Sequence, residues 1–197
     1  MPQSSIKDLA GLLKQIKQES SQAKKLPPVH LWNPPFCGDI DMRIARDGKW
    51  YYMGTPIGRS AMVKLFSTIM RRDEDNFYLV TPVEKVGIQV EDAPFVVVLM
   101  EVIEQGKDQI VKLITNVEDE IYVGSDHPLR VEYKNKNHEP APYVLVRDRL
   151  EALISRNVFY QMVDIAEEKE IEGKKCLGIW SQGQFYSLGC LDVNVEL

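Results

Sequence analysis

The sequence predicts an α+β protein in which a unit of strand pair, helix and strand pair occurs twice. Short stretches that alternate apolar and polar residues are typical of strands, whereas apolar residues recurring three and four positions apart are typical of helices. Both kinds of stretch follow one another in the same order in the two halves of the chain. We therefore expect two domains, residues 1–93 and residues 94–197, each with one copy of the unit.

Two segments precede the first unit. Residues 6–16 are expected to form an amphipathic helix that packs against another surface, because their apolar residues recur at helical spacing. Residues 24–36 contain four prolines, which exclude a helix and favour an extended arm. Because the arm also contains Leu31, Trp32 and Phe36, we expect it to lie against the body of the protein.

The first unit is expected to begin with a hairpin, residues 41–46 and 50–53, around an Asp-Gly turn. A helix is expected over residues 60–72, since its apolar residues fit the 3.6-residue period and two arginines suit its C-terminus. A second hairpin, residues 77–81 and 85–90, completes this unit.

The second half contains several further alternating stretches. Strands are expected at residues 95–104, 109–116, 120–123, 129–133 and 143–146. One long helix is expected over residues 150–166, and the last hairpin pairs residues 176–180 with 185–188 across a Gln-Gly turn.

The proposed repeat aligns short segments from the two halves. Residues 42–44, 57–59 and 62–66 and the hairpin from Phe77 match residues 129–131, 145–147 and 150–154 and the hairpin from Leu177. The helix spacings agree residue for residue. Strand-like and helix-like segments also resemble one another by chance, so duplication and coincidence both remain open.

Composition excludes several classes of protein. A formal net charge of -5 argues against binding along nucleic acid, which needs a basic face. No apolar run reaches the roughly 18 residues of a membrane span, and the N-terminus lacks the order of a signal peptide. We expect a cytoplasmic protein. Its three cysteines indicate neither a disulfide framework nor a zinc site, and we expect them to be small buried hydrophobic residues.

Three passages resemble the bacterial family catalogued as domain of unknown function 1285. They are residues 30–44 (HLWNPPFCGDIDMRI), 52–59 (YMGTPIGR) and 78–90 (YLVTPVEKVGIQV), and the resemblance covers essentially the whole chain. It implies a duplicated α+β core and a C-terminal half that is a strongly bent antiparallel sheet with one long helix, superficially like the pleckstrin-homology fold. It also implies a cleft between the halves, proposed as a ligand site in signalling, and no established reaction.

Two arginines precede expected helices. These are Arg59 and Arg147. The positive end of a helix dipole disfavours a cation at such a position, so we expect an anion near each of them. One possibility is an anionic ligand held by the guanidinium groups in a cleft between the repeats. The other, which is commoner in proteins, is an internal ion pair with Asp39, Asp41 or Glu84.

A pair of carboxylates raises the possibility of a metal site. Asp39 and Asp41 lie on one side of an extended segment, because side chains alternate along a strand, and carboxylate oxygens suit divalent cations. No third ligand follows nearby in the sequence, which favours a structural role. A metal-dependent hydrolase or transferase using Asp39, Asp41 and Glu84 is the alternative function.

Other motifs do not match known catalytic patterns. Residues 54–58 are not a phosphate-binding loop, and Ser181 misses the Gly-x-Ser-x-Gly nucleophile elbow by one residue. Residues 81–85 interrupt two strands with a proline and expose polar groups at a sheet edge. Trp50 and Trp180 belong to hairpins, where aromatic residues usually pack in the core but can also form the wall of a pocket.

We interpret the chain as a non-enzymatic binding or signalling module that binds a small anionic molecule or a peptide between two related halves. No cofactor, metal or nucleic acid is expected, and the sequence does not determine the oligomeric state. The candidate ligand-binding residues are Asp39, Asp41, Trp50, Thr55, Arg59, Thr81, Glu84, Lys85, Arg147, Trp180 and Ser181.

Overall fold

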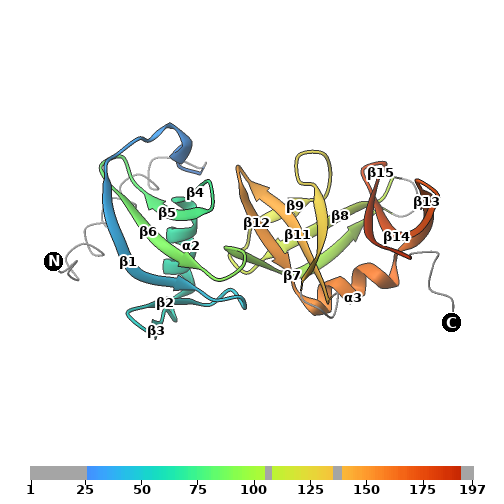
Figure 1. Cartoon of the computed structure of the whole chain (residues 1–197), viewed down its shortest axis with the longest axis horizontal. Coiled ribbons are helices and arrows are strands. Elements are labelled where there is room, and N and C mark those ends of the chain that lie inside the picture. The colour runs from blue at the N-terminus through green and yellow to red at the C-terminus, as the bar shows by residue number, and fades with distance from the viewer. Residues whose placement is uncertain (1–25, 105–107, 135–138, 192–197) are drawn as a thin grey trace. The chain divides into compact units, whose positions relative to one another are not determined.

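The computed structural model describes residues 26–104, 108–134 and 139–191. The expected helix over residues 6–16 therefore lies outside the described residues. The chain divides between Asp92 and Ala93 into two compact units (Figure 1). The described residues form three sheets and two short α-helices, so the protein is mostly β and the expected α+β class is wrong.

The N-terminal unit is one six-stranded sheet with the strand order β3-β2-β1-β6-β5-β4. Only β1 and β6 run parallel to each other, and the other neighbours are antiparallel. Its elements are η1 (Val29–Leu31), β1 (Phe36–Ile44), β2 (Trp50–Tyr52), β3 (Thr55–Pro56), α2 (Ser60–Thr68), β4 (Met70–Asp73), β5 (Asn76–Val80) and β6 (Lys85–Val90). Both expected hairpins of this unit are confirmed.

The core of this unit lies between α2 and one face of the sheet. Met42 and Ile44 on β1 alternate with exposed or half-buried residues and are themselves buried. Trp50, opposite Ile44 on β2, stacks on Phe66 of α2 with ring centroids 6.2 Å apart. The apolar stripe of the helix thus covers the apolar face of the sheet.

The helix α2 ends at Thr68, earlier than the expected residue 72. Residues 70–73 instead form β4, in which Met70 pairs with Leu79 of β5. Arg71 and Arg72 therefore belong to a strand and not to a helix C-terminus. The apolar spacing that predicts helix continues into β4 because Ile69 and Met70 are both buried, so periodicity alone does not mark the end of the helix.

The proline-rich arm lies against the N-terminal unit, as expected. Arg71 Nη1 donates to the backbone oxygen of Trp32 at 2.7 Å, and the backbone N–H of Lys85 donates to the oxygen of Pro35 at 3.1 Å. These bonds attach the C-terminal part of the arm to the sheet.

The C-terminal unit contains a curled six-stranded sheet, order β10-β11-β12-β7-β8-β9, and a three-stranded sheet, order β13-β14-β15 (Figure 1). Its elements are β7 (Phe95–Ile103), β8 (Ile110–Thr115), β9 (Glu120–Tyr122), β10 (Leu129–Lys134), β11 (Glu139–Arg147), β12 (Leu150–Ile154), α3 (Arg156–Asp164), β13 (Glu167–Ile171), β14 (Lys174–Ser181) and β15 (Gln184–Leu191). The expected strands and the last hairpin are confirmed, whereas β13 is missing from the sequence prediction.

The long helix expected over residues 150–166 is wrong. Leu150, Ala152 and Ile154 are buried and alternate with half-buried residues, so this part is the strand β12. The helix α3 begins only after Ser155 and has nine residues. The stretch fits both periods, and pairing with β7 and β11 decides in favour of a strand.

The expected repeat and the pleckstrin-homology-like C-terminal half are therefore also incorrect. Residues 145–147 and 150–154 lie in strands, whereas their proposed counterparts lie before and inside α2. The chain continues past α3 into a separate three-stranded sheet. The two large sheets do share one strand order when one of them is read in reverse. In each sheet, the first three strands form one meander and the last three form another, and the first and the sixth strand pair in parallel.

Candidate functional site

The two arginines singled out in the sequence lie in different surroundings. Arg147 belongs to β11, not to a helix N-terminus, and its Nη1 lies 2.5 Å from Asp119 Oδ2 with the guanidinium 4.8 Å from the centre of the Phe95 ring. An internal ion pair thus exists for Arg147, although Asp119 is none of the three expected acids. Arg59 is exposed directly before α2 and makes no ion pair with any residue of the described part.

The three carboxylates of the alternative metal site do not gather. Asp39 and Asp41 are exposed on β1, and Glu84 lies in the turn between β5 and β6. Within the described residues, no group of three or more His, Cys, Asp or Glu side chains lies close enough to hold a metal ion. Asp39 instead contacts Gly87 of β6, and its Oδ1 occupies the space that a Cβ at Gly87 would fill.

The polar residues at 81–85 shape a turn. Thr81 is buried, its backbone N–H donates to the Glu84 oxygen at 2.9 Å, and its hydroxyl oxygen accepts the Glu84 N–H at 3.2 Å. Lys85 Nζ lies 3.3 Å from Asp73 Oδ2 and 4.6 Å from the centre of the Tyr78 ring. These contacts account for Thr81 and Lys85 without a ligand.

Asp73 connects these contacts to the proline-rich arm. Its Oδ1 lies 2.9 Å from Nε of Arg71, the residue that also binds the Trp32 oxygen. Burial raises the pKa of Asp73, but the hydrogen bonds and positive charges of Arg71 and Lys85 outweigh burial, so this pKa lies below its ordinary value. Asp73, Arg71 and Lys85 thus form a network of ion pairs, and Arg71 connects this network to the arm.

The remaining candidate residues of the N-terminal unit divide between core and surface. Trp50 is fully buried against Phe66 and is not accessible to a ligand from solvent. Thr55 is exposed on β3, the edge strand of its sheet.

In the C-terminal unit, Trp180 and Ser181 also make internal contacts. Trp180 Nε1 donates to Glu167 Oε2 at 3.0 Å, and Lys169 Nζ lies 4.7 Å from the centre of the Trp180 ring. The Ser181 hydroxyl is buried and donates to the Val123 oxygen at 2.6 Å. Both residues hold β14 in place.

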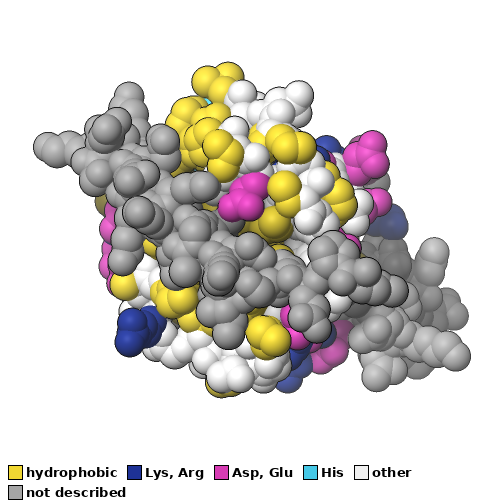
Figure 2. Space-filling view, turned by 90° about the vertical axis from the view of Figure 1, so that its left-hand side faces the viewer, with side chains coloured by type: hydrophobic (Ala, Val, Ile, Leu, Met, Phe, Trp, Pro, Cys, Tyr) yellow, Lys and Arg dark blue, Asp and Glu magenta, His cyan; other side chains and the backbone are white. Residues whose placement is uncertain are grey.

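The N-terminal unit exposes large apolar side chains near its arm. Leu31, Phe36 and Val83 are 72%, 54% and 58% exposed. Figure 2, which looks onto the N-terminal side, shows hydrophobic side chains at the surface there. Phe36 also contacts Tyr78, with ring centroids 6.0 Å apart. This surface is apolar and exposed.

The C-terminal unit contains a cavity of about 380 Å³, which lies within the size range of small-molecule sites. Its wall comes from β10, α3 and all three strands of the small sheet. The lining residues are Tyr133, Phe159, Val163, Glu168, Lys175, Cys176, Leu177, Leu188, Gly189 and Cys190.

A disulfide and a glycine shape this cavity. Cys176 and Cys190 face each other on β14 and β15 and are bonded, which contradicts the expectation of free, buried cysteines; Cys37 is free and exposed. A Cβ at Gly189 would lie 2.6 Å from the Tyr133 hydroxyl oxygen, so only glycine lets this ring approach the sheet so closely. The Tyr133 hydroxyl donates to the Leu188 oxygen at 3.4 Å.

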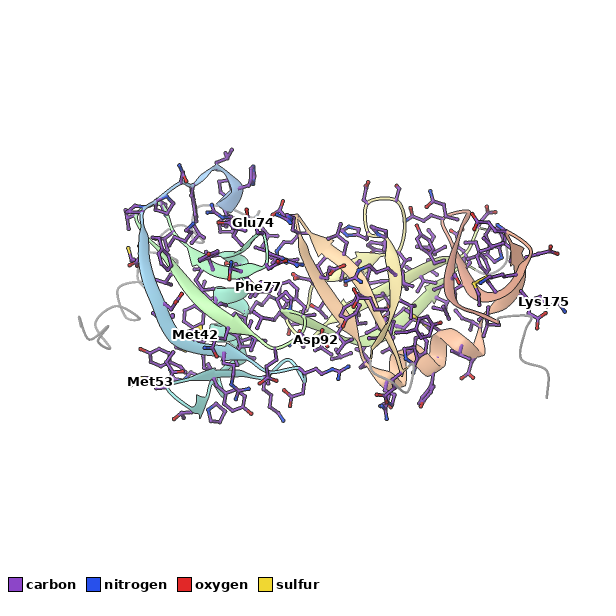
Figure 3. All side chains as sticks on the ribbon, in the orientation of Figure 1. Met42, Met53, Glu74, Phe77, Asp92 and Lys175 are labelled. Atoms are coloured by element: carbon purple, nitrogen blue, oxygen red, sulfur yellow. A yellow bond between two sulfur atoms is a disulfide. The ribbon has the colours of Figure 1, made fainter. Side chains whose placement is uncertain are left out.

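The charges of the cavity lie at its solvent-exposed parts. Glu168 on β13 and Lys175 on β14 are exposed, whereas Cys176 and Leu188 are buried (Lys175 is labelled in Figure 3). Lys174 directly precedes Lys175 on β14, so its side chain points to the opposite face of the strand, and it is not among the lining residues. The interior of the cavity is therefore apolar, and its rim carries charge.

None of these lining residues is among the candidate ligand-binding residues expected from the sequence. One available signal is that Cys176 and Cys190 lie at almost equal distances from the Gln182-Gly183 turn, which places them opposite each other in a hairpin. Tyr133, Phe159 and Leu188 come from three separate elements, and no local pattern connects them.

Fold and cavity together define a mostly β protein of two units with an apolar cavity in the second. Residues 27–93 match the model of the N-terminal domain of the DUF1285 family, a domain of unknown function, and residues 94–188 match the C-terminal domain of the same family. The chain belongs to the DUF1285 family.

Two solved structures are similar to this chain. The crystal structure of a DUF1285 family protein from Silicibacter pomeroyi is 54% identical, with a TM-score of 0.81, and the match covers 92% of this chain and 96% of that chain. One from Shewanella baltica is 26% identical, with a TM-score of 0.51, over 64% of this chain and 91% of that chain. No curated protein matches the chain.

Two observations concern the expected location. Neither described α-helix has the length and apolar character that crossing a bilayer requires. Disulfides such as Cys176–Cys190 persist mainly in oxidising compartments, so the cytoplasmic location stays a prediction.

Proposed function

We propose that this protein is a non-enzymatic binding module whose C-terminal cavity accepts a small molecule or short peptide segment that combines an apolar body with a negative charge. The apolar cavity of about 380 Å³ carries this proposal. Burying an apolar group there removes its surface from water, which provides the main driving force for binding.

The negative charge of the ligand is inferred from the rim. Lys175 lines the cavity and is exposed, so its ammonium group is available at the rim. A carboxylate or sulfonate at this rim forms a charge-assisted contact while its apolar body lies inside. Glu168 is the only acid among the lining residues of the described chain, and it lies on the neighbouring strand β13.

The lining supports binding more than catalysis. Its charged side chains, Glu168 and Lys175, are exposed, and its buried lining residues are Cys176 and Leu188. A buried group held beside a nucleophile or a base, as acid–base chemistry requires, does not occur among these lining residues. The cleft between the two halves, implied by the family resemblance, stays a prediction.

Two fluorescent probes test the proposal: 8-anilinonaphthalene-1-sulfonate, which carries a negative charge, and its uncharged parent N-phenyl-1-naphthylamine. Val163→Trp should fill the cavity from α3 and weaken both probes about tenfold or more, since this side chain lines the wall. Tyr160→Trp is the matched control, because Tyr160 is exposed on the same helix and does not line the cavity.

The charge preference has its own test. Lys175→Gln should weaken the sulfonate probe and leave the uncharged probe unchanged, because only the former contacts the ammonium group. Equal loss of binding in Val163→Trp and Tyr160→Trp would contradict the location of the site. Equal affinities of the two probes, unaffected by Lys175→Gln, would contradict the preference for an anion.

A further inference from the structure

We propose that the cavity is redox-sensitive: the Cys176–Cys190 disulfide keeps its wall in the binding conformation, and reduction of this bond by a dithiol weakens binding of the ligand. This inference rests on the proposed function, since it concerns the same cavity. It adds a chemical regulator of that cavity, and it makes the bound ligand a protector of the disulfide.

The disulfide joins the two segments that form most of the cavity wall. Residues 175–177 of β14 and residues 188–190 of β15 all line the cavity, and the bond connects Cys176 in the first segment to Cys190 in the second. β15 is also the edge strand of its sheet, where it pairs with β14 alone. The bond therefore adds a covalent link to a wall segment that has one neighbouring strand.

The strand ladder is interrupted next to the disulfide. Leu177 pairs with Gly189 but Gly178 pairs with Ser187, so Leu188 is an extra residue in β15. Beyond this bulge, β15 continues past Cys190 by a single residue. A short ladder at a strand end opens easily, so the disulfide decides whether this end of the wall stays closed.

Tyr133 couples this part of the hairpin to the rest of the cavity wall. A Cβ at Gly189 would lie 2.6 Å from its hydroxyl oxygen, and the hydroxyl donates to the Leu188 oxygen at 3.4 Å. Both contacts require the hairpin end to stay in place. Opening of the strand end therefore separates β15 from β10, and the cavity loses its shape.

A reductant approaches the bond at Cys190, which is exposed, whereas Cys176 is buried. One thiolate of the dithiol attacks the Cys190 sulfur and forms a mixed disulfide, and the Cys176 sulfur leaves as a thiolate that takes up a proton. The second thiolate of the dithiol then attacks the reductant's sulfur in the mixed disulfide. This step closes the oxidised reductant and releases Cys190 as a thiolate, which is protonated in turn. The protein gains two electrons and two protons, and the dithiol loses them.

The size of the effect follows from the population of the binding conformation. If the reduced hairpin keeps the wall closed about 10% of the time, the measured affinity falls about tenfold. Linkage makes the effect reciprocal. A ligand that binds the oxidised protein about tenfold more tightly lowers the ratio of reduced to oxidised protein about tenfold at saturation.

The first test measures binding of 8-anilinonaphthalene-1-sulfonate before and after reduction with dithiothreitol. The wild type should bind the probe about tenfold more weakly after reduction, and circular dichroism checks that it stays folded. Cys37→Ala should show the same loss, because Cys37 is free and belongs to the N-terminal unit. Cys176→Ala with Cys190→Ala should bind as weakly as the reduced wild type and should not respond to dithiothreitol.

The second test leaves the disulfide intact, so it does not depend on the folding of the double variant. Cys37→Ala is equilibrated in mixtures of reduced and oxidised dithiothreitol, and alkylation of free thiols with mass spectrometry gives the ratio of reduced to oxidised protein. Saturating probe should lower this ratio about tenfold. Adding Val163→Trp should remove the effect of the probe, because this substitution fills the cavity.

The possible failures can be distinguished. Saturable binding of equal affinity before and after reduction, with a ratio that the probe does not change, would overturn the redox sensitivity and leave the proposed function in place. Tighter binding by the reduced protein would overturn it as well, since the wall would then bind better without the crosslink. No saturable binding to the oxidised protein would overturn the proposed function itself.

Discussion

At the scale of single residues, Ser181 shows how a polar side chain is used inside the C-terminal unit. It lies at the end of β14, where its hydroxyl donates to the Val123 oxygen at 2.6 Å and accepts the Val111 N–H at 3.0 Å. Both partners are buried backbone groups, and neither finds water as a substitute. The hydroxyl therefore joins β14 to the end of β9 and to β8.

Replacing this hydroxyl tests that role. Ser181→Ala leaves two buried backbone groups without a partner and should lower the free energy of unfolding by about 1–3 kcal/mol. Urea denaturation followed by circular dichroism measures the change. Ser125→Ala is the control, since Ser125 is exposed in the same unit and should change stability by less than about 0.5 kcal/mol. A similarly small change for Ser181→Ala would contradict the structural role.

At the scale of elements, the hairpin of β14 and β15 forms most of one cavity wall. Gln182 and Gly183 have φ angles of 52° and 72°, so both turn residues adopt the left-handed conformation of a tight hairpin turn. At the other end of the hairpin, the Cys176–Cys190 disulfide crosslinks the strands. The wall is thus held at both ends.

Removing this crosslink should destabilise the C-terminal unit. The disulfide closes a loop with a sequence separation of 14 residues, and the loss of such a constraint on the unfolded chain is worth about 3 kcal/mol. The double variant Cys176→Ala with Cys190→Ala should therefore unfold at lower urea concentration, and dithiothreitol should shift the wild type in the same direction.

Cys37 provides the control for that experiment, because it is free and exposed in the N-terminal unit. Cys37→Ala should leave the urea midpoint unchanged, with or without the reductant. An unchanged midpoint in the double variant would show that the crosslink does not stabilise the hairpin.

At the scale of the whole molecule, the chain changes units within two consecutive residues. Asp92 Oδ2 lies 3.0 Å from Arg46 Nε, which belongs to the N-terminal unit (Asp92 is labelled in Figure 3). Ala93 is buried with Ala141 and Tyr143 of the C-terminal unit. Each unit also has its own sheet and its own buried residues. The natural division therefore lies between residues 92 and 93.

Separate folding of the two parts is the corresponding prediction. Fragments 1–92 and 93–197 should each unfold cooperatively in urea, because the division between residues 92 and 93 removes no strand from its sheet. The control division, 1–98 and 99–197, cuts β7 after the buried residues Phe95 and Val97, and its second fragment should not fold. Cooperative unfolding of that fragment, or its absence in 93–197, would contradict this account.

Much of the fold follows from local patterns. The hairpins around Asp47-Gly48 and Gln182-Gly183 and the strands at 95–104 and 109–116 are correctly expected, since turn residues and period-two alternation are properties of neighbouring residues. The helix at 150–166 is wrong because Leu150–Ile154 satisfies both periods, and only pairing with β7 and β11 distinguishes them.

The candidate site follows far less from the sequence. Lys85, Arg147 and Ser181 are chosen for their chemistry, and all three make internal contacts with residues distant in sequence. The partner of Arg147 is Asp119, 28 positions away, and nothing in the local sequence connects the two. Residue type thus indicates what a side chain can do, and its neighbours decide what it contacts.

By itself, the sequence determines where most of the strands and turns of this protein lie, that its proline-rich arm packs against the body, and that its net charge disfavours nucleic acid. Only the tertiary structure decides the strand order, the Cys176–Cys190 bond and the cavity. The physical reason is the sequence distance over which each feature is decided. Alternation and turn chemistry act between neighbouring residues. The cavity wall, assembled from β10, α3 and β13–β15, depends on packing between residues more than 50 positions apart, such as Tyr133 and Leu188.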